Sequence, residues 1–433
     1  MAVNKILLMN YGLSCEIGVT RQMWMVHEGD IVVSAIPVDE KFLDYLCELS
    51  GIDRDKVTVL NIGRDVDEET LTAPDLVARL RAAMGGSTEW ELLPAAHTEA
   101  VAALAELLGL PIDTGLRFTA QRGPDLLNRK SHFRQLAAGA GVTLPAGAIV
   151  TTEAELAAAV ERLLPETGTV IVKRDNDLGG AGNRALTTKE AGPLNGVRET
   201  VAVNGNRVEA VARLWRELAG VDGQVLVAEA YHHATDIFYF EYHIGPDGIA
   251  RMLDTGLRRD AVGEPDAPSL VWVGLEIPAD LPPGTAARAL TESGRLADLA
   301  ARLGYRGHLN IDGIRTVDGA LYFNEINARW GGCTALHDIG EKLFGPAYAD
   351  HHVISGLRVL TPMRFADAVD LLRRNGVHFT PESGEGAIVL GYDAELGKAT
   401  ECVLIGPTRE RVREIEEHLR AVAGTVTDPA LVE

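Results

Sequence analysis

The sequence predicts a mixed α/β and α+β protein, in which an N-terminal domain built on a parallel sheet precedes antiparallel hairpins and a small α+β segment. Two observations lead to this prediction. Over residues 1–120, short apolar runs alternate with helical patterns through short connections, which is typical of a parallel sheet covered by helices. After residue 120, β-rich runs are instead joined by turn sequences, which is typical of antiparallel pairs.

The N-terminal domain is expected to hold four strands and three helices. Its strands are short apolar runs, and its helices show apolar residues at helical spacing, two of them closed by glycines. A possible ligand loop, residues 10–18, follows the first strand, but it lacks G-x-G-x-x-G, and a structural turn is the favoured interpretation. The expected strands are 4–10, 29–37, 56–60 and 90–94, and the expected helices are 39–51, 73–86 and 98–111.

After residue 120 the predicted secondary structure changes twice along the chain. A helix over 124–140, a strand and a second helix lead into a β-branched strand that ends at Lys173, and antiparallel strands follow. After about residue 345 a tail with its own helices and strands remains. The expected elements are a helix at 152–166, antiparallel strands over 224–257 with a turn at 245–248, a helix at 284–304, helices near 364–374 and 408–422, and strands at 386–392 and 399–406.

Composition and charge exclude several classes of protein. The 433 residues carry a formal net charge of −21, and such a field repels the phosphates of nucleic acids. No apolar run is long enough to span a membrane, and the N-terminal run is too short for a signal peptide. Four widely spaced cysteines without a C-x-x-C pair predict reduced thiols and a cytoplasmic protein. Whether the chain forms a homo-oligomer is left open by the sequence.

The most informative stretch is a hairpin sequence at residues 307–327. Asp318-Gly319 lies between two alternating apolar runs, which is a strong signal for a two-residue hairpin turn. With these two residues as the loop, Asp312 lies directly opposite Glu325. Facing carboxylates repel each other and destabilise a strand pair.

Asn327 lies two residues after Glu325 and therefore on the same face of its strand. A solvated acidic face is the plainest interpretation of such a group, but the flanking residues are apolar, and buried unpaired carboxylates are costly. Oxygen ligands without His or Cys favour Mg²⁺, with Mn²⁺ as the alternative. Asp312, Glu325 and Asn327 are therefore predicted to bind a metal ion.

Because Mg²⁺ retains phosphate ligands, phosphate-binding residues should accompany it. Lys173 ends a strand and precedes a loop with three glycines, whose backbone N–H groups can approach phosphate oxygens. The loop is not a Walker A motif, and alone it is a weak signal. Lys130 at a helix start and Glu229 at a strand end are unremarkable in isolation. The three loop glycines are Gly179, Gly180 and Gly182.

Taken in order over residues 121–345, these elements resemble the ATP-grasp superfamily. The resemblance implies two subdomains that hold ATP and Mg²⁺ between them, here about 121–228 and 229–345, with 346–433 completing the region. Arg329 matches the arginine of the family's E-I-N-x-R motif, and Arg258 is a second candidate for the substrate carboxylate, although a solvated Arg258-Arg259 pair is an equal alternative. The implied ATP-binding residues are Lys130, Lys173, a lid at 176–183 containing the three glycines, a hinge at Glu229, Ala230 and Tyr231, and Asp236 for the ribose.

The resemblance implies an enzyme that phosphorylates a carboxylate to an acyl phosphate, which an amine then attacks with release of ADP. More narrowly, residues 1–120, the stretch 172–186 and the tail resemble the pheganomycin-type peptide ligases, which have a pre-ATP-grasp N-terminal domain. That resemblance implies antibiotic biosynthesis, an amino-acid-like carboxylate and a peptide amine. Alternatives that stay open are a ligase for CoA or another small molecule and a non-catalytic ATP-binding domain. Arg174-Asp175 replace a proline found in better-known members, so lid closure is expected to differ in detail.

Overall fold

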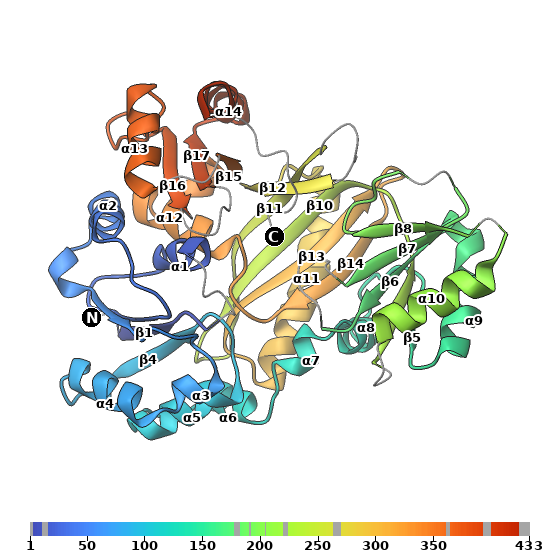
Figure 1. Ribbon diagram of the computed structural model, residues 1–433, viewed down its shortest axis with the longest axis horizontal. Helices are drawn as coiled ribbons and strands as arrows, with labels where there is room; N and C mark the ends of the chain where they lie inside the picture. Colours follow the sequence, from blue (N-terminus) through green and yellow to red (C-terminus); the bar gives the residue numbers. More distant parts are fainter. Residues whose placement is uncertain are drawn as a thin grey trace.

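The computed structural model describes residues 3–10, 16–176, 182–189, 192–203, 205–219, 224–262, 270–360, 364–392 and 400–423. Their strands form three sheets of four, five and eight strands. Figure 1 shows the four-stranded sheet on the left, the five-stranded sheet on the right and the eight-stranded sheet between them. Among the described helices, none is long and apolar enough to cross a membrane.

The four-stranded sheet is parallel throughout, in the order β3-β2-β1-β4, which confirms the predicted N-terminal architecture. Helix α2 ends as predicted at Gly51, which adopts a left-handed φ of 66° that glycine accommodates without strain. Three helices of this region, α1, α3 and α6, were not expected. The elements are β1 (Asn4–Leu8), α1 (Glu16–Met23), β2 (Ile31–Ser34), α2 (Glu40–Ser50), η1 (Arg54–Lys56), β3 (Thr58–Asn61), α3 (Glu68–Leu71), α4 (Pro74–Ala83), β4 (Trp90–Pro94), α5 (Glu99–Leu108) and α6 (Thr114–Ala120).

The five-stranded sheet has the order β5-β9-β6-β7-β8 and is packed against α9 and α10. The single helix expected over 124–140 is wrong in one respect, because Arg129 is extended (φ −82°, ψ 128°) and divides it into α7 and α8. This break makes Lys130 the first residue of α8. The elements are α7 (Asp125–Asn128), α8 (Lys130–Gly139), β5 (Gly147–Val150), α9 (Glu153–Thr167), β6 (Thr169–Arg174), β7 (Asn183–Thr187), β8 (Glu199–Ala202), α10 (Arg207–Ala219) and β9 (Leu226–Ala230).

The eight-stranded sheet has the order β14-β13-β10-β11-β12-β15-β17-β16 and is antiparallel. The C-terminal strands extend this sheet, because β12 pairs with β15 through Glu276↔Ser355 and Ile277↔Ile354. The elements are β10 (Ala234–Ile244), β11 (Ala250–Val262), β12 (Leu270–Ile277), α11 (Pro283–Leu303), β13 (Gly307–Thr316), β14 (Leu321–Asn327), α12 (Thr334–Phe344), η2 (Tyr348–Asp350), β15 (Val353–Leu360), α13 (Phe365–Arg374), β16 (Gly386–Gly391), β17 (Thr400–Gly406) and α14 (Arg409–Ala423).

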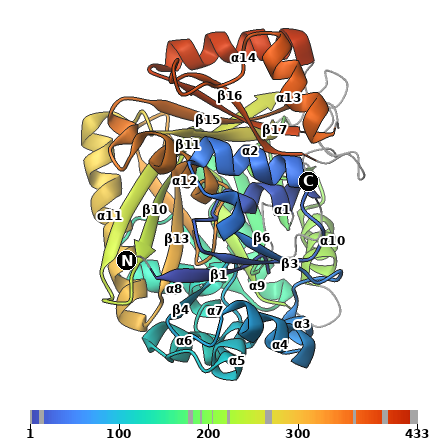
Figure 2. The same cartoon turned by 90° about the vertical axis from the view of Figure 1, so that its left-hand side faces the viewer.

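The beginning and the end of the chain share one hydrophobic core. Trp24 and Phe42 from the N-terminal region pack edge-to-face at 6.2 Å between ring centroids, and Phe42 meets Phe365 of α13 at 5.4 Å and Tyr392 at 5.5 Å. Figure 2 shows α1 and α2 beside α12 and below the C-terminal strands and helices. Since burial of aromatic side chains is strongly stabilising, the N-terminal region is held firmly against the C-terminal segment.

Candidate active site

The β13–β14 hairpin brings the predicted metal ligands together. Asp312 lies opposite Glu325, and Asn310 lies opposite Asn327, so the predicted register is confirmed. The turn itself differs from the prediction. Thr316 pairs with Ala320 (N···O 3.0 Å) around a three-residue loop, and an irregularity on the β14 side of the pair shifts the register back before the site. The two offsets cancel each other.

The three side chains lie within hydrogen-bond distance of one another. Asn327 Nδ2 donates to Asp312 Oδ2 at 2.8 Å and lies 3.5 Å from Glu325 Oε1. Lys130 Nζ lies 3.5 Å from Glu325 Oε2, across the gap between α8 and β14. An acidic pair, an amide and a lysine therefore meet at one point, although Lys130 lies far from the other three in the sequence.

The pKa values of the two carboxylates are shifted in opposite directions. Burial raises the pKa of Asp312 well above its usual range, and the facing Glu325 raises it further. Burial also acts to raise the pKa of Glu325, but the charges of Lys130, Lys173 and Arg329 outweigh it, and the net pKa is lowered. One proton on the pair relieves the repulsion when no cation is bound.

This donor set fits a hard cation with few protein ligands, because two carboxylates and one amide leave room for water and phosphate oxygens. Within the described part of the chain, no group of three or more His, Cys, Asp or Glu residues is arranged to hold a metal ion. A site that also relies on Asn327 is consistent with that result. The chemistry of the side chains therefore suits Mg²⁺ bound together with a nucleotide.

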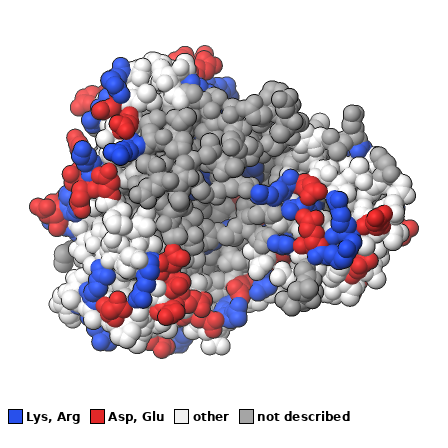
Figure 3. Space-filling view, viewed as in Figure 1, with Lys and Arg blue, Asp and Glu red and all other residues white. Residues whose placement is uncertain are grey.

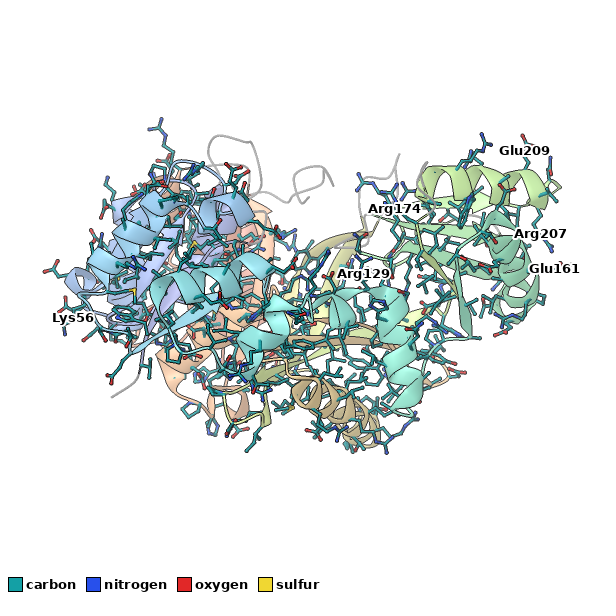
Figure 4. The ribbon with its side chains drawn as sticks, turned by 90° about the horizontal axis from the view of Figure 1, so that it is seen from below. Lys56, Arg129, Glu161, Arg174, Arg207 and Glu209 are labelled. Atoms are coloured by element: carbon teal, nitrogen blue, oxygen red, sulfur yellow. The ribbon has the colours of Figure 1, made fainter. Side chains whose placement is uncertain are left out.

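Asp175, at the end of β6, fixes the start of α8. Its main-chain oxygen accepts from Lys130 N at 3.0 Å, and its Oδ1 accepts from Ser131 N at 2.8 Å. Arg129 Nη1 lies 3.3 Å from its Oδ2, and Figure 4 labels Arg129 near the centre of the molecule. Because Lys173 lies two residues before Asp175, this contact sets the spacing of the two lysines.

Lys173 and Glu229 form a buried ion pair on neighbouring strands. Lys173 Nζ lies 2.6 Å from Glu229 Oε2, and Arg134 Nη1 pairs with the other oxygen. Burial acts to raise the pKa of Glu229, but Lys173 and Arg134 lower it more, so the carboxylate stays charged. The single negative charge of Glu229 neutralises only one of the two cations, Lys173 and Arg134. The group of three therefore carries a net positive charge, which favours a neighbouring phosphate.

The three residues of the predicted hinge line the cavity, and two of their backbone N–H groups already donate hydrogen bonds within the protein. Glu229, Ala230 and Tyr231 line the cavity described below. Ala230 N donates to Ala146 O at 2.8 Å, and Tyr231 N donates to Thr169 O at 2.9 Å. These two N–H groups therefore hold the strand in place, and an adenine ring at the hinge would meet other atoms.

Two further predictions have different outcomes. Asp236 pairs with Arg315 of β13 and is not among the residues that line the cavity. Of the lid glycines, Gly179 and Gly180 lie outside the described residues, whereas the Gly182 carbonyl accepts from Arg174 N at 3.2 Å. Arg174 also donates to two carbonyl groups of α10. Figure 4 labels it close to this helix.

A single cavity of about 450 Å³ joins these groups. Arg329 and Arg258 both line it, and Arg258 forms an ion pair with Asp260 at 2.7 Å. The main chain after the motif is anchored to the N-terminal region, since Trp330 N donates to Ala95 O at 3.0 Å. The predicted site residues at the cavity are Lys130, Lys173, Glu229, Ala230, Tyr231, Arg258, Asp312, Glu325, Asn327 and Arg329.

The cavity also contains residues that sequence reasoning did not single out. Gly18, Arg21, Gln22 and Met25 come from α1 and the turn after it, and Trp272 comes from β12. Gly18, Arg21 and Gln22 have the spacing i, i+3 and i+4, which places them on one face of α1, and Met25 lies in the turn after it. That spacing is the signal that could have identified them.

The surface in Figure 3 carries Lys and Arg interspersed with Asp and Glu over its described residues on this face. Over the described residues of this face, the mixed charge does not form a continuous basic surface.

Comparisons with known proteins identify the fold. A family model described as Pre ATP-grasp domain matches residues 19–110, and one described as PGM1 C-terminal domain matches residues 367–419. No curated protein matches the sequence.

Solved structures are similar to this chain over nearly its whole length. The biotin carboxylase domain of the Hydrogenobacter thermophilus 2-oxoglutarate carboxylase, in complex with MgADP, ADP and bicarbonate, has a TM-score of 0.58 at 15% identity and covers 95% of this chain and 89% of its own. N5-carboxyaminoimidazole synthetase from Staphylococcus aureus, complexed with ADP, has a TM-score of 0.55 at 10% identity and covers 98% of each chain. L-amino acid ligase from Bacillus licheniformis has a TM-score of 0.55 at 13% identity and covers 99% of each chain. At these identities the likeness establishes the fold, which is the ATP-grasp fold with an N-terminal pre-ATP-grasp domain.

Proposed function

We propose that this chain is an ATP-dependent ligase that joins a small carboxylate to an amine and releases ADP and phosphate. The observation that carries the proposal is the meeting of Asp312, Glu325 and Asn327 with Lys130, which lies 3.5 Å from Glu325. A nucleotide-sensing or structural domain has no need for such a set, since these groups are suited to stabilising charge during phosphoryl transfer.

ATP and Mg²⁺ are the proposed ligands, with Mn²⁺ as an alternative metal. The bound ion would supply charge neutralisation at the phosphates. Asp312, Glu325 and Asn327 would hold it, and Lys130 and Lys173 would neutralise phosphate oxygens. The hinge at 229–231 would contact the adenine, the lid at 176–183 would cover the phosphates, and Asp236 would reach the ribose only after leaving Arg315.

The carboxylate substrate is assigned to the arginines. Arg329 follows the metal ligands on the same chain segment, and Arg258 extends into the cavity from β11. A guanidinium binds a carboxylate through two parallel hydrogen bonds and can follow its oxygens as they become an acyl phosphate. The amine then forms a bond to the acyl carbon, the C–O bond to phosphate breaks, and the nitrogen loses a proton.

The proposal also covers the identity of the two substrates, and two features support a peptide as the amine substrate. The fold is shared with an L-amino acid ligase, and the tail matches the model described as PGM1 C-terminal domain. We propose an amino-acid-like carboxylate and a peptide N-terminus as substrates, in a cytoplasmic, pheganomycin-type pathway of antibiotic biosynthesis. The domain limits 1–120, 121–345 and 346–433 belong to the same proposal.

A screen for ADP release over pairs of carboxylates and amines tests the proposed function. The expected result is ADP release that requires Mg²⁺ and both substrates of one pair. ADP release that depends on CoA in place of an amine would favour the CoA-ligase alternative, and tight ATP binding without turnover on any pair would favour a non-catalytic domain.

A further inference from the structure

A row of polar side chains crosses four neighbouring strands of the eight-stranded sheet. The strand register pairs Asn327 of β14 with Asn310 of β13, and Asn310 with Glu241 of β10. Glu241 is paired in turn with Asp254 of β11. Because paired residues of adjacent strands point to the same face of a sheet, the row starts at a proposed metal ligand and continues away from it. The proposed function uses only Asn327, which leaves the other three without a role.

Glu241 is the ionised member of this row. It is 0% exposed, and burial acts to raise its pKa, but the imidazole of His308 and two donors from α12 and its N-cap lower the pKa more. The neighbouring Asp254 differs, because burial and the charge of Glu241 raise its pKa well above its usual range. A buried ionised carboxylate is costly, and apolar side chains could fill the same space without that cost. The groups that the carboxylate holds therefore indicate its role.

Two of these groups belong to the chain segment that follows the proposed metal ligands. Thr334 Oγ1 donates to Glu241 Oε1 at 2.5 Å, and the thiol of Cys333 donates to Oε2. Burial and the charge of Glu241 raise the pKa of Cys333 well above its usual range, so the sulfur keeps the proton that it donates. Asn310 Nδ2 donates to the same sulfur at 3.1 Å. The Thr334 hydroxyl also accepts from Gly331 N at 2.9 Å, which connects Glu241 to the main chain.

This segment, residues 328–334, has little to fix its conformation locally. It contains Gly331 and Gly332, and glycine backbone loses much entropy when it is fixed. Helix α12 starts after Cys333, whose side chain does not cap the helix. Figure 2 shows α12 close to β10 and β13, the strands that carry its polar partners. The position of the segment must therefore come from contacts with other elements.

Arg329 lies between two such contacts. On its N-terminal side, Ala328 N donates to Asn128 Oδ1 at 2.8 Å. On its C-terminal side, Glu241 holds Thr334. Arg329 lines the cavity, whereas Glu241 is not one of the described residues that do so. Any influence of Glu241 on a substrate must therefore pass through the segment.

We propose that Glu241 is a positioning residue for the carboxylate substrate, because its buried charge fixes the segment 328–334 and thereby sets where Arg329 meets that carboxylate. Glu241 itself touches neither the substrates nor the nucleotide. The proposal rests on the proposed ligase function, and it adds a residue outside the cavity that controls how the carboxylate is bound.

Glu241→Gln tests the hold on the segment directly. It keeps the size of the side chain but replaces one acceptor oxygen with an NH₂ group, so the hydroxyl of Thr334 and the thiol of Cys333 can no longer both donate to it. Hydrogen exchange is measured by mass spectrometry on peptides that cover residues 328–334. Exchange of these N–H groups is expected to become about tenfold faster, in line with one lost hydrogen bond to a charged group.

The effect on the reaction is measured with ATP, Mg²⁺ and hydroxylamine, so that no amine substrate has to be known. The wild type is assayed with a panel of amino acids and other small carboxylic acids, and the acid that forms a hydroxamate fastest is used further. Glu241→Gln is expected to lower kcat/KM for that acid about tenfold or more, because a displaced guanidinium binds the carboxylate less well. The KM for ATP should stay unchanged, since Lys173 and the hinge at 229–231 lie on the five-stranded sheet.

Tyr242→Phe is the matched control. Tyr242 is the next residue of β10 and is equally buried, but its hydroxyl lies 2.8 Å from Ser293 Oγ of α11 instead of contacting α12. The variant also loses one buried hydrogen bond and should be destabilised to a similar extent. It should change neither the exchange of residues 328–334 nor kcat/KM.

Variants at Thr334 test the link itself. Thr334→Val removes the hydroxyl that joins Glu241 to Gly331 and should reproduce both effects of Glu241→Gln, whereas Thr334→Ser keeps the hydroxyl and should behave as the wild type. When Glu241→Gln and Thr334→Val are combined, kcat/KM should fall no further than in the weaker single variant, because both changes remove one link. If Glu241→Gln fails to fold, Thr334→Val compared with Thr334→Ser still tests the link.

Unchanged exchange in Glu241→Gln, or equal exchange in Glu241→Gln and Tyr242→Phe, would overturn the positioning role while leaving the ligase function intact. Faster exchange with an unchanged kcat/KM, or losses that multiply in the combined variant, would overturn it as well. A wild type that forms no hydroxamate with any acid removes the ligase function instead, and the exchange measurement alone then decides whether Glu241 holds the segment.

Discussion

At the scale of single residues, the site depends on an acidic pair that is unfavourable without a cation. Asp312 and Glu325 face each other across two strands, and both are only partly exposed to the water that would screen their repulsion. The fold retains this arrangement, and Asn327 and Lys130 supply the groups that make it useful. Unfavourable groups retained in a packed cavity are typical of a functional site.

Glu325→Gln is predicted to separate stability from activity. The amide keeps the shape and removes the repulsion with Asp312, but it also removes the ion pair with Lys130, so the free energy of unfolding should change little. Binding of Mg²⁺–ATP should weaken, and kcat/KM should fall on the order of 10²-fold or more, because a charged group at the phosphates is lost. Urea unfolding and steady-state assays at limiting Mg²⁺ check the two halves.

Asp318→Asn is the control for that variant, since Asp318 is an exposed carboxyl at the tip of the same hairpin and accepts from Thr316. It should leave the Mg²⁺ dependence unchanged. Wild-type turnover by Glu325→Gln at limiting Mg²⁺ would show that the metal assignment is wrong.

The sequence predicts this pair because the alternation of a hairpin is local. It predicts the register correctly although the turn is three residues long, since a register shift restores the pairing. It does not predict Arg134 beside Glu229, or Gln22 and Trp272 in the cavity. Those neighbours come from other elements, and their proximity depends on tertiary packing that no local pattern records.

At the scale of elements, the position of Lys130 depends on a break between two helices. Periodicity suggests one helix over 124–140, but Arg129 is extended and α8 begins afresh at Lys130. Asp175, which follows β6, accepts hydrogen bonds from the first two N–H groups of α8. These bonds favour a helix start at Lys130 over one continuous helix. Asp175 lies in another part of the sequence, which is why periodicity alone misses the break.

Asp175→Ala is predicted to destabilise the protein by about 1–2 kcal/mol, the usual effect of losing a helix cap with a partly buried ion pair. The KM for ATP should rise, because the start of α8 carries Lys130. Asp175→Asn, which keeps an acceptor for Ser131 N, should recover much of the stability. Thermal unfolding and ATP titration measure the two effects.

A matched comparison is Asp113→Ala, which removes the cap of α6, where Asp113 accepts from Leu116 N at 2.8 Å, away from the cavity. It should lower stability by a similar amount without changing the KM for ATP. An Asp175→Ala variant with an unchanged KM for ATP would contradict the role given to this contact.

Helix α1 was missed for a related reason. It has eight residues, including a glycine and three β-branched residues, and such a composition has low helix propensity. Val19 and Met23 are buried in the core that α1 shares with the C-terminal segment. Tertiary packing therefore stabilises the helix, and this packing positions α1 at the wall of the cavity.

At the scale of the whole molecule, the N-terminal region and α12 are joined by a buried polar contact. Asp338 pairs with Lys342 on the same helix and lies 3.2 Å from His27 Nε2. Lys342 in turn donates to the main chain at Trp24 and to Val26 O, the latter at 2.8 Å. The turn after α1 is thereby tied to the helix that follows the proposed metal ligands, so both walls of the cavity have a common support.

This contact predicts an acid-dependent loss of stability. Burial acts to raise the pKa of Asp338, but the charge of Lys342 and the contact with His27 lower it to about 2. A carboxyl whose pKa is depressed in the folded state stabilises the fold above its unfolded pKa, and that contribution is lost as the pH falls through the folded value. The shift corresponds to roughly 2 kcal/mol at neutral pH, lost between about pH 5 and pH 2.

Asp338→Asn should lower the free energy of unfolding at pH 7 by roughly that amount and flatten its dependence on acid pH, as measured by urea unfolding over this range. Glu341→Gln is the control, because Glu341 is an exposed carboxyl on the same helix, and it should change neither. An Asp338→Asn variant with the acid dependence of the wild type would assign the effect to other carboxyls.

The central claim is that this fold transfers a phosphoryl group from ATP to a carboxylate. The most direct measurement is to incubate the protein with ATP, Mg²⁺, a panel of carboxylic acids and hydroxylamine, and to identify the products by mass spectrometry. The account predicts a hydroxamate together with ADP and phosphate, with the formation of all three strongly reduced in Glu325→Gln. AMP and pyrophosphate alongside the hydroxamate would contradict it, since the carboxylate would then have been adenylated and the roles given to Lys173, Asp312 and Asn327 would not hold.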